Sequence, residues 1–171
     1  MASNTTPHHS GNSSLKFTKG AQGMKIYPRN FNIVWGNDTR YWNVPKNTDL
    51  AAELCQVSWL EVTGGVVGTK AGKSYEVGFS VSLNPDAFGW GKYPIYIMIK
   101  RGNEEKATWT KIMINPNQKG QFEIKGRLTR GSDHQIEGSD DGKLSFGLYE
   151  VWSGKWKGGL KIHFAYVKEL P

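Results

Sequence analysis

Cysteine is scarce in this chain: Cys55 is the single cysteine among 171 residues. An intrachain disulfide is therefore impossible, which excludes a small secreted scaffold held together by disulfide bonds. Long apolar runs are lacking too. Residues 1–20 have no apolar segment of the kind found in a secretory signal peptide, and no stretch has the length of a membrane-spanning helix. These absences predict a cytoplasmic protein without membrane insertion.

The sequence also lacks motifs for catalysis, metal binding and phosphate binding. Its four histidines do not have the spacing of metal ligands: His8, His9, His134 and His163. Cys55 has no neighbour suited to a catalytic triad. The glycines of residues 64–72 do not lie between a strand and a helix, as a phosphate-binding loop requires. We therefore expect neither enzyme activity nor a cofactor or metal.

Acidic residues are outnumbered by basic ones, 15 against 22, which gives a net charge of +7 and an isoelectric point near 9.4. Such an excess favours acidic partners, RNA among them. However, no run of five basic residues occurs, and the densest basic groups are short: 100–101, 125–130 and 155–157. A scattered pattern is typical of a solvated surface. The charge alone favours that interpretation over a dedicated nucleic-acid face.

The main positive signal is alternation of apolar and polar residues. From Tyr75 to Leu83 every second residue is apolar and the residues between are Glu, Gly or Ser, a pattern typical of a half-buried strand. Similar segments recur along the chain: 31–35, 55–63, 95–99, 107–114, 122–128, 144–148 and 160–166. Turn-forming Gly, Asn, Asp and Pro residues separate them. Eight or more short strands predict an all-β antiparallel sandwich of jelly-roll type.

Two departures from this strand pattern are expected. Residues 49–54 predict one short helix, because Ala51 to Leu54 follow the candidate capping residues Thr48 and Asp49. Residues 1–22 are rich in Ser, Thr, Asn, Gly and Lys and predict a flexible tail. Residues 23–171 then form one domain. No internal repeat occurs, which disfavours a propeller or solenoid.

Two tryptophans, Trp35 and Trp42, enclose the polar turn GNDTR of residues 36–40. A sugar-binding site needs these parts, because the C–H face of a pyranose packs on an indole while its hydroxyls need donors and acceptors. Trp35 is in phase with the apolar residues before it, so it lies either in the core or at its rim. Trp42 follows the polar turn, which favours an exposed ligand platform. We expect polar contacts from three residues of this segment: Asn37, Asp38 and Tyr41.

Glu150 is in phase with the apolar residues of 144–148, so a carboxylate is expected on the inward face where that strand ends. A charge in that position needs either an ionic partner within the protein or a ligand that it binds. It accepts hydrogen bonds from sugar hydroxyls, or it forms a salt bridge with Lys155 or Lys157. Further candidates for sugar contact follow in the next turn: Trp152, Lys155 and Lys157. A glycosidase would need a second facing carboxylate, for which Asp38 is the best but unconvincing candidate.

Several of these segments together resemble plant lectins of the Nictaba type, close to the phloem protein 2 lectins of cucurbits. The resemblance runs from about Ile26 to Leu170. Its marks are IVW and YW around the polar turn, LCQVSWLEV at 54–62, YEVGF at 75–79, LSFGLYE at 144–150 and WKGGL at 156–160. Lys143 stands where some relatives have an acidic residue, and the lysine run proposed for nuclear import in some relatives is absent.

The resemblance implies a β-sandwich, commonly a homodimer, that binds N-acetylglucosamine oligomers and the chitobiose core of N-glycans. It also implies residence in the cytoplasm and phloem sap, and no catalysis. It associates the positions of Trp35 and Trp42 with sugar binding and proposes a contribution from the glutamate at Glu150. The sequence thus predicts a chito-oligosaccharide lectin with these three residues in its site.

Two alternatives from other classes stay open. An RNA-binding phloem transport protein would account for the basic charge and aromatic loops, and it is compatible with sugar binding. A structural phloem protein would cross-link through Cys55, although a buried, reduced thiol is the favoured interpretation of that residue.

Overall fold

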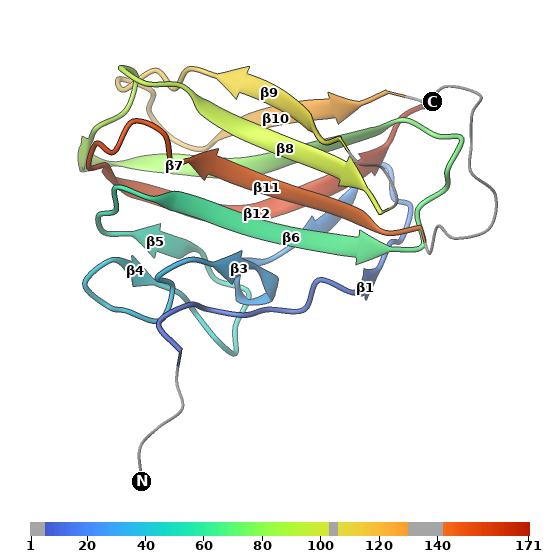
Figure 1. The fold of residues 1–171 in the computed structure, drawn as a ribbon, viewed down its shortest axis with the longest axis horizontal. Coiled ribbons are helices and arrows are strands. Elements are labelled where there is room, and N and C mark those ends of the chain that lie inside the picture. The colour runs from blue at the N-terminus through green and yellow to red at the C-terminus, as the bar shows by residue number, and fades with distance from the viewer. Residues whose placement is uncertain (1–5, 103–105, 130–141) are drawn as a thin grey trace, which may run out of the picture.

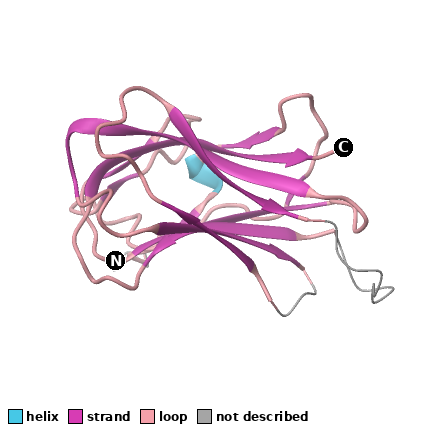
Figure 2. Cartoon of the chain, turned by 90° about the horizontal axis from the view of Figure 1, so that it is seen from above, coloured by secondary structure: helices cyan, strands magenta, loops and turns pink. Residues whose placement is uncertain are grey.

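The computed structural model describes residues 6–102, 106–129 and 142–171. These residues form two six-stranded sheets. Figure 2 shows the sheets as two stacked layers, with the one-turn 3-10 helix η1 (Pro28–Asn30) between them in this view. The all-β sandwich that the alternation predicts is confirmed.

Sheet A has the strand order β1-β6-β11-β8-β9, and β3 also pairs with β6. Its strands are β1 (Leu15–Lys16), β3 (Asn32–Ile33), β6 (Leu60–Val67), β8 (Ile95–Arg101), β9 (Thr108–Ile112) and β11 (Leu144–Glu150). The pairs are antiparallel except for β1 with β6. Figure 1 shows the four longer strands, β6, β11, β8 and β9, side by side along the long axis.

Sheet B has the strand order β10-β7-β12-β5-β4, and β2 also pairs with β12. Its strands are β2 (Met24–Ile26), β4 (Trp42–Asn43), β5 (Ala52–Leu54), β7 (Tyr75–Phe88), β10 (Phe122–Leu128) and β12 (Gly158–Glu169). All of its pairs are antiparallel. The long neighbours β7 and β12 form the centre of the sheet.

The core lies between the sheets and follows from the period-two pattern, because alternate side chains of a strand point to the same face. Three phenylalanines connect the two layers: Phe31, Phe79 and Phe146. Their ring centroids are 5.8–6.4 Å apart in edge-on pairs, a geometry that aromatic rings prefer. All three are fully buried.

The predicted helix at 49–54 is wrong. Ala52–Leu54 form β5, which pairs with both β4 and β12. Ala52 and Leu54 are fully buried, so the segment has the period of a strand rather than of a helix. Helix propensity is a weak preference, and here the hydrogen bonds of two neighbouring strands and burial in the core outweigh it.

The predicted flexible tail does not fit residues 6–22. The pair β1–β6 places Leu15 opposite Val66, and the backbones of His9 and Ile33 exchange two hydrogen bonds of 2.9 and 2.8 Å. His9 is buried. This segment therefore belongs to the folded sandwich, while residues 1–5 lie outside the described part of the chain.

Candidate functional site

Loops from three parts of the sequence meet at one end of the sandwich. The Cys55 amide donates to the carbonyl of Tyr41 (2.8 Å), and Val57 and Lys157 exchange two backbone hydrogen bonds of 2.9 Å. The turn after β3, the connection between β5 and β6, and the connection between β11 and β12 are thus neighbours. The residues predicted for the site all lie in or beside these loops.

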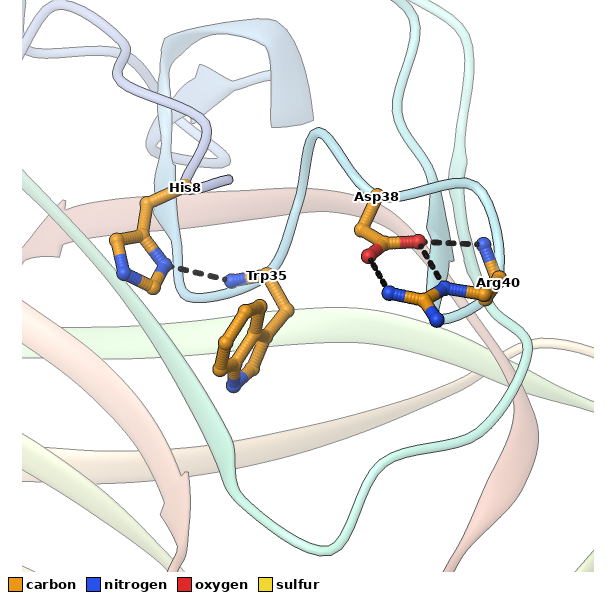
Figure 3. Close-up of polar contacts among 4 residues, drawn as sticks. All are labelled: His8, Trp35, Asp38 and Arg40. Atoms are coloured by element: carbon orange, nitrogen blue, oxygen red, sulfur yellow. Dashed lines mark hydrogen bonds and ion pairs between the residues drawn. The ribbon is translucent and has the colours of Figure 1, made fainter. Parts of the chain in front are cut away.

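Trp35 lies at the rim and not in the core, with 38% of its surface exposed. Its φ angle of 66° is left-handed, which is unfavourable for a bulky residue. The Trp35 amide donates to Nδ1 of His8 (2.9 Å), a contact that Figure 3 shows. Its indole contacts the Tyr41 ring at 5.8 Å, and Tyr41 stacks on Trp156 at 6.4 Å. We call Trp35, Tyr41 and Trp156 the turn surface.

The polar residues of the turn are engaged within the protein. Arg40 donates to Asp38 from its amide and Nε (both 3.0 Å) and from Nη2 (2.7 Å), as Figure 3 shows. These hydrogen bonds hold the pKa of Asp38 below its ordinary value. Asn37 donates from Nδ2 to the carbonyls of Thr6 (3.1 Å) and His8 (2.9 Å). The structure therefore does bring Asn37, Asp38 and Tyr41 together, but the Asp38 carboxylate and the Asn37 amide nitrogen already have partners.

Trp42 is not a surface residue. Only 1% of it is exposed, and its Nε1 is buried without a hydrogen-bond partner among the described residues. It opens β4, where it pairs with Leu54 of β5, and its inward position places the indole in the core. The prediction that Trp42 presents an exposed platform is therefore wrong.

Glu150 forms the salt bridge that was one of its two alternatives, and its partner is Lys157. The Lys157 Nζ lies 3.7 Å from Oε2 of Glu150, and both side chains are 2% exposed. Lys157 also donates to the carbonyl of Ser58 (2.9 Å), and the hydroxyl of Ser153 donates to Oε1 of Glu150. Burial lowers the pKa of Lys157, while the nearby carboxylate opposes that shift. Lys155, in contrast, is exposed.

A cleft of about 530 Å³ opens beside Glu150. Its lining is mostly aromatic: Tyr93, Pro94, Tyr96, Trp109, Glu150, Trp152 and Ser153. The ring of Trp152 lies 5.1 Å from that of Tyr96 and 6.0 Å from that of Trp109. Trp109 is 48% and Trp152 is 60% exposed. Large exposed indoles around a concavity are typical of ligand-binding surfaces.

Tyr149 extends the aromatic lining along the outer face of sheet A. Its ring lies 5.3 Å from that of Trp109 and covers Gly147, where an added Cβ would approach Tyr149 Cε2 to 2.5 Å. Glycine at 147 thus allows the ring to lie flat on the sheet. Burial, with the nearby charge of Glu61, raises the pKa of Tyr149 above its ordinary value.

The sequence-based prediction included Glu150 and Trp152 but missed their aromatic neighbours in the cleft. The sequence does contain a signal for these aromatic neighbours. Tyr96 alternates with the buried residues Ile95 and Ile97, so it occupies a position that faces water. Trp109 is paired with Met98, another outward position. Aromatic residues on the polar face of a strand are therefore the pattern to search for.

Lys143, the residue that departs from the resemblance, precedes β11, whereas Glu150 ends it. The length of that strand separates the two, so the departure does not alter the cleft. Cys55 is exposed, which contradicts the expected buried thiol. Partial burial, with the charge of Glu53, raises the pKa of its thiol, so the thiol is the dominant form at neutral pH.

Within the part of the chain that the structure describes, no three His, Cys, Asp or Glu residues are grouped so as to hold a metal ion. In the same residues no helix is long and apolar enough to cross a membrane. His134 and Arg130 lie outside the described residues. The arrangement that remains is an aromatic cleft with a buried carboxylate at its edge, which is suited to binding a neutral, partly apolar ligand.

Comparison with solved structures supports the fold. A xylanase 10C from Cellvibrio japonicus, solved as an E385A mutant in complex with xylopentaose, superposes with a TM-score of 0.51 over 94% of this chain and 28% of its own. Only 7% of the residues are identical, so this likeness concerns the architecture alone.

Comparison with curated sequences gives closer relatives. The protein PHLOEM PROTEIN 2-LIKE A9 of Arabidopsis thaliana is 39% identical over 99% of this chain and 100% of its own length. A lectin from Luffa acutangula is 33% identical over 53% of this chain and 48% of its own. The sequence model described as phloem protein 2 matches residues 21–168. The chain therefore belongs to the phloem protein 2 family.

Proposed function

We propose that this protein is a lectin that binds N-acetylglucosamine oligomers, free or as the chitobiose core of N-glycans, in the cleft that Trp109 and Trp152 help to line. The cleft is the observation that carries the proposal. Its volume of about 530 Å³ falls within the range of small-ligand sites. The similarity to a Luffa acutangula lectin supports a carbohydrate ligand.

The lining of the cleft explains how such a sugar would be held. Exposed indole faces of Trp109 and Trp152 offer flat apolar surfaces for the C–H faces of β-linked pyranoses and for the methyl groups of acetamido substituents. The phenol of Tyr96 offers a donor and an acceptor for sugar hydroxyls, and the Ser153 hydroxyl, whose proton is donated to Glu150, offers a further acceptor. Glu150, held by Lys157, supplies a fixed negative charge at the edge of the cleft.

The same lining favours binding without hydrolysis. Glycoside hydrolysis generally uses two carboxyl groups on opposite sides of the bond. Among the described residues that line the cleft, Glu150 is the single carboxylate. Asp38, the other candidate from the sequence, is held in three hydrogen bonds by Arg40.

The affinity of one site should be modest. Sugar hydroxyls exchange hydrogen bonds with water for hydrogen bonds with protein, so only the stacked faces give a clear gain, and we expect binding free energies of about −8 to −4 kcal/mol. The homodimer that the resemblance implies would present two clefts and gain avidity without any new contact.

Titration calorimetry with chitotriose tests the proposal. We expect saturable binding by the wild type, weakened at least tenfold in Trp109→Ala and in Trp152→Ala, because each loses a stacking face. Trp35→Ala and Trp156→Ala are matched controls, since both indoles are also exposed but lie on the turn surface. Cellotriose, which has the same linkage without acetamido groups, should bind more weakly if those groups are recognised.

Each result of this titration has a clear meaning. Absence of chitotriose binding by the wild type would refute the proposed function. Loss of binding in Trp35→Ala, with normal binding in Trp109→Ala, would move the site to the turn surface, as the resemblance implies for Trp35.

A second candidate function is RNA binding, favoured by a polar pocket on the outer face of sheet B. Basic and aromatic side chains line it together with two carboxylates: Gln22, Lys25, Glu76, Glu123, Lys125, Phe164, Tyr166 and Lys168. Phosphate contacts release counterions, so RNA binding should weaken steeply as salt increases. Binding of a neutral sugar should barely change between low and physiological salt, which separates the two functions.

A further inference from the structure

The aromatic cleft continues across the outer face of sheet A, contact by contact, to the start of β6. Trp152 contacts Trp109 (6.0 Å), and Trp109 contacts Tyr149 (5.3 Å). Tyr149 of β11 is paired in register with Glu61 of β6. Oε1 of Glu61 accepts a hydrogen bond of 3.0 Å from Nε1 of Trp59. We call Trp59, Glu61, Tyr149, Trp109 and Trp152 the aromatic row.

Trp59 forms the far end of this row, and its exposure and fixed orientation suit contact with a ligand. It is 47% exposed, although burying an indole is usually favourable. Its hydrogen bond to Glu61 fixes the edge of the ring and leaves a large part of the indole in solvent. An exposed but orientationally fixed aromatic ring loses little conformational entropy when a ligand packs on it.

The row crosses the strands rather than running along one of them. Its members come from β9, from β11 and the turn after it, and from the start of β6, and the sheet order β6-β11-β8-β9 places β6 and β9 three strand spacings apart. Three spacings of about 4.8 Å amount to roughly 14 Å. The four strands lie side by side in Figure 1, which faces this sheet. A ligand that contacts both Trp109, on β9, and Trp59, just before β6, must therefore be extended.

The row combines aromatic rings with one carboxylate, which suits a chain of pyranoses with apolar C–H faces and polar substituents. Aromatic rings occur at both ends and in the middle, and the Glu61 carboxylate offers acceptors for hydroxyl or acetamido N–H groups. Its negative charge disfavours a nucleic-acid strand. In the middle of the row the Tyr149 ring covers Gly147, which has no side chain, and therefore lies close to the sheet.

From these contacts we propose that Trp59 and Glu61 form a distal subsite, and that the ligand of this face is a linear β-linked oligosaccharide of three or more units. The inference rests on the proposed function, since it places the first units of the same sugar chain in the cleft. The distal subsite makes the protein select its oligosaccharide ligands by chain length. Short oligomers fill only the cleft, whereas longer ones extend over Tyr149 to Trp59.

Titration of chito-oligosaccharides of two to six units tests the subsite. For the wild type we expect affinity to keep rising beyond the disaccharide. For Trp59→Ala the increase should stop at the disaccharide, with about a fivefold to tenfold loss for the hexamer and unchanged binding of the dimer. Glu61→Gln, which retains the bulk of the side chain, should lose part of the same increment. Trp156→Ala, an indole of similar exposure (52%) outside the row, should keep the full length dependence.

The possible failures are distinguishable. If no oligomer binds the wild type, the proposed function fails and the subsite with it. If the dimer binds but longer oligomers bind no better, or if Trp59→Ala and Glu61→Gln match the wild type at every length, the distal subsite is refuted while the proposed lectin function is not. Circular dichroism of each variant shows whether it is folded. If Trp59→Ala does not fold, Glu61→Gln still tests the subsite.

Discussion

At the scale of single residues, a tryptophan is buried or exposed according to its position in a strand and its backbone conformation, and not according to the polarity of its neighbours in the sequence. Trp42 follows a polar turn, yet it opens β4 and is buried. Trp35 ends an apolar segment, yet its left-handed backbone turns it out to the rim. Sequence context is a poor guide at such turns, because one residue of shift moves a side chain to the opposite face.

Replacing Trp42 should therefore lower the stability of the fold and leave the affinity for sugar unchanged. Trp42→Ala leaves a large cavity in the core, and we expect a loss of about 3–5 kcal/mol in the free energy of unfolding. Trp42→Phe should cost much less, because the phenyl ring fills most of that space while the buried Nε1 donor, which has no partner among the described residues, is removed.

Urea denaturation measures both changes, with Trp156→Ala as the exposed control, for which we expect less than about 1 kcal/mol. Chitotriose affinity per folded molecule should be the same for Trp42→Phe as for the wild type. A stable Trp42→Ala with lost sugar binding would restore the platform role that the resemblance implies.

At the scale of elements, the N-terminal segment behaves as part of the sandwich. Its composition is that of a loop, but residues 6–17 hydrogen-bond to the chain at several points, including the pairs His9 with Ile33 and Phe17 with Val67. It also supplies the acceptors for Asn37 and for the Trp35 amide. The segment thus holds the turn surface in its conformation.

Deleting residues 1–16 should lower the thermal midpoint. The deletion removes the β1–β6 pair and the exchange with Ile33, and with about 1 kcal/mol net per hydrogen bond the loss should be about 2–3 kcal/mol. For a protein of this size that corresponds to roughly 5–10 °C. Scanning calorimetry measures it, and deletion of residues 1–5 serves as the control. Equal midpoints for both deletions would show that the segment contributes nothing to stability.

The sequence predicted most strands because each alternates apolar and polar residues by itself. What it could not predict depends on partners distant in the chain. Ala52–Leu54 become a strand because β4 and β12 lie on either side. Trp109, Tyr96 and Trp152 form a cleft only because β8, β9 and the turn after β11 are adjacent. Glu150 was identified correctly as an inward carboxylate, but its choice of Lys157 over Lys155 required the fold.

At the scale of the whole molecule, the two outer faces differ in chemistry. The face of sheet A carries the aromatic row, whereas that of sheet B carries ionic contacts around Glu76. Arg127 donates to Oε1 of Glu76 (3.1 Å), and the Tyr166 hydroxyl donates to Oε2 (2.9 Å). Burial opposes ionisation of Glu76, but these hydrogen bonds prevail and lower its pKa. Sugar binding and acid stability should therefore be separable properties.

Acidification should destabilise the protein progressively. Burial, with the nearby charge of Lys161, lowers the pKa of His163 below 6.5, and the pKa values of Glu76, Glu169 and Asp38 lie below their ordinary 4.5, 4.5 and 3.8. In each case the unfolded chain binds more protons in the window just below the ordinary value, so stability falls as pH falls. The loss should begin near pH 6.5 and steepen below about 4.5.

Glu76→Gln measures how much the buried carboxylate of Glu76 contributes to this loss of stability at low pH. At pH 7 we expect a lower thermal midpoint than that of the wild type, because Arg127 loses its ionic partner and Tyr166 its charged acceptor, a loss of about 1–3 kcal/mol. As pH falls through the folded pKa of Glu76 the wild type is protonated there too, so the two midpoints should converge. Asp38→Asn, at an ion pair whose arginine is exposed, should show a smaller gap that closes in the same way. A gap between Glu76→Gln and the wild type that stays constant from pH 7 to pH 3 would show that the carboxylate charge at this position does not contribute to stability.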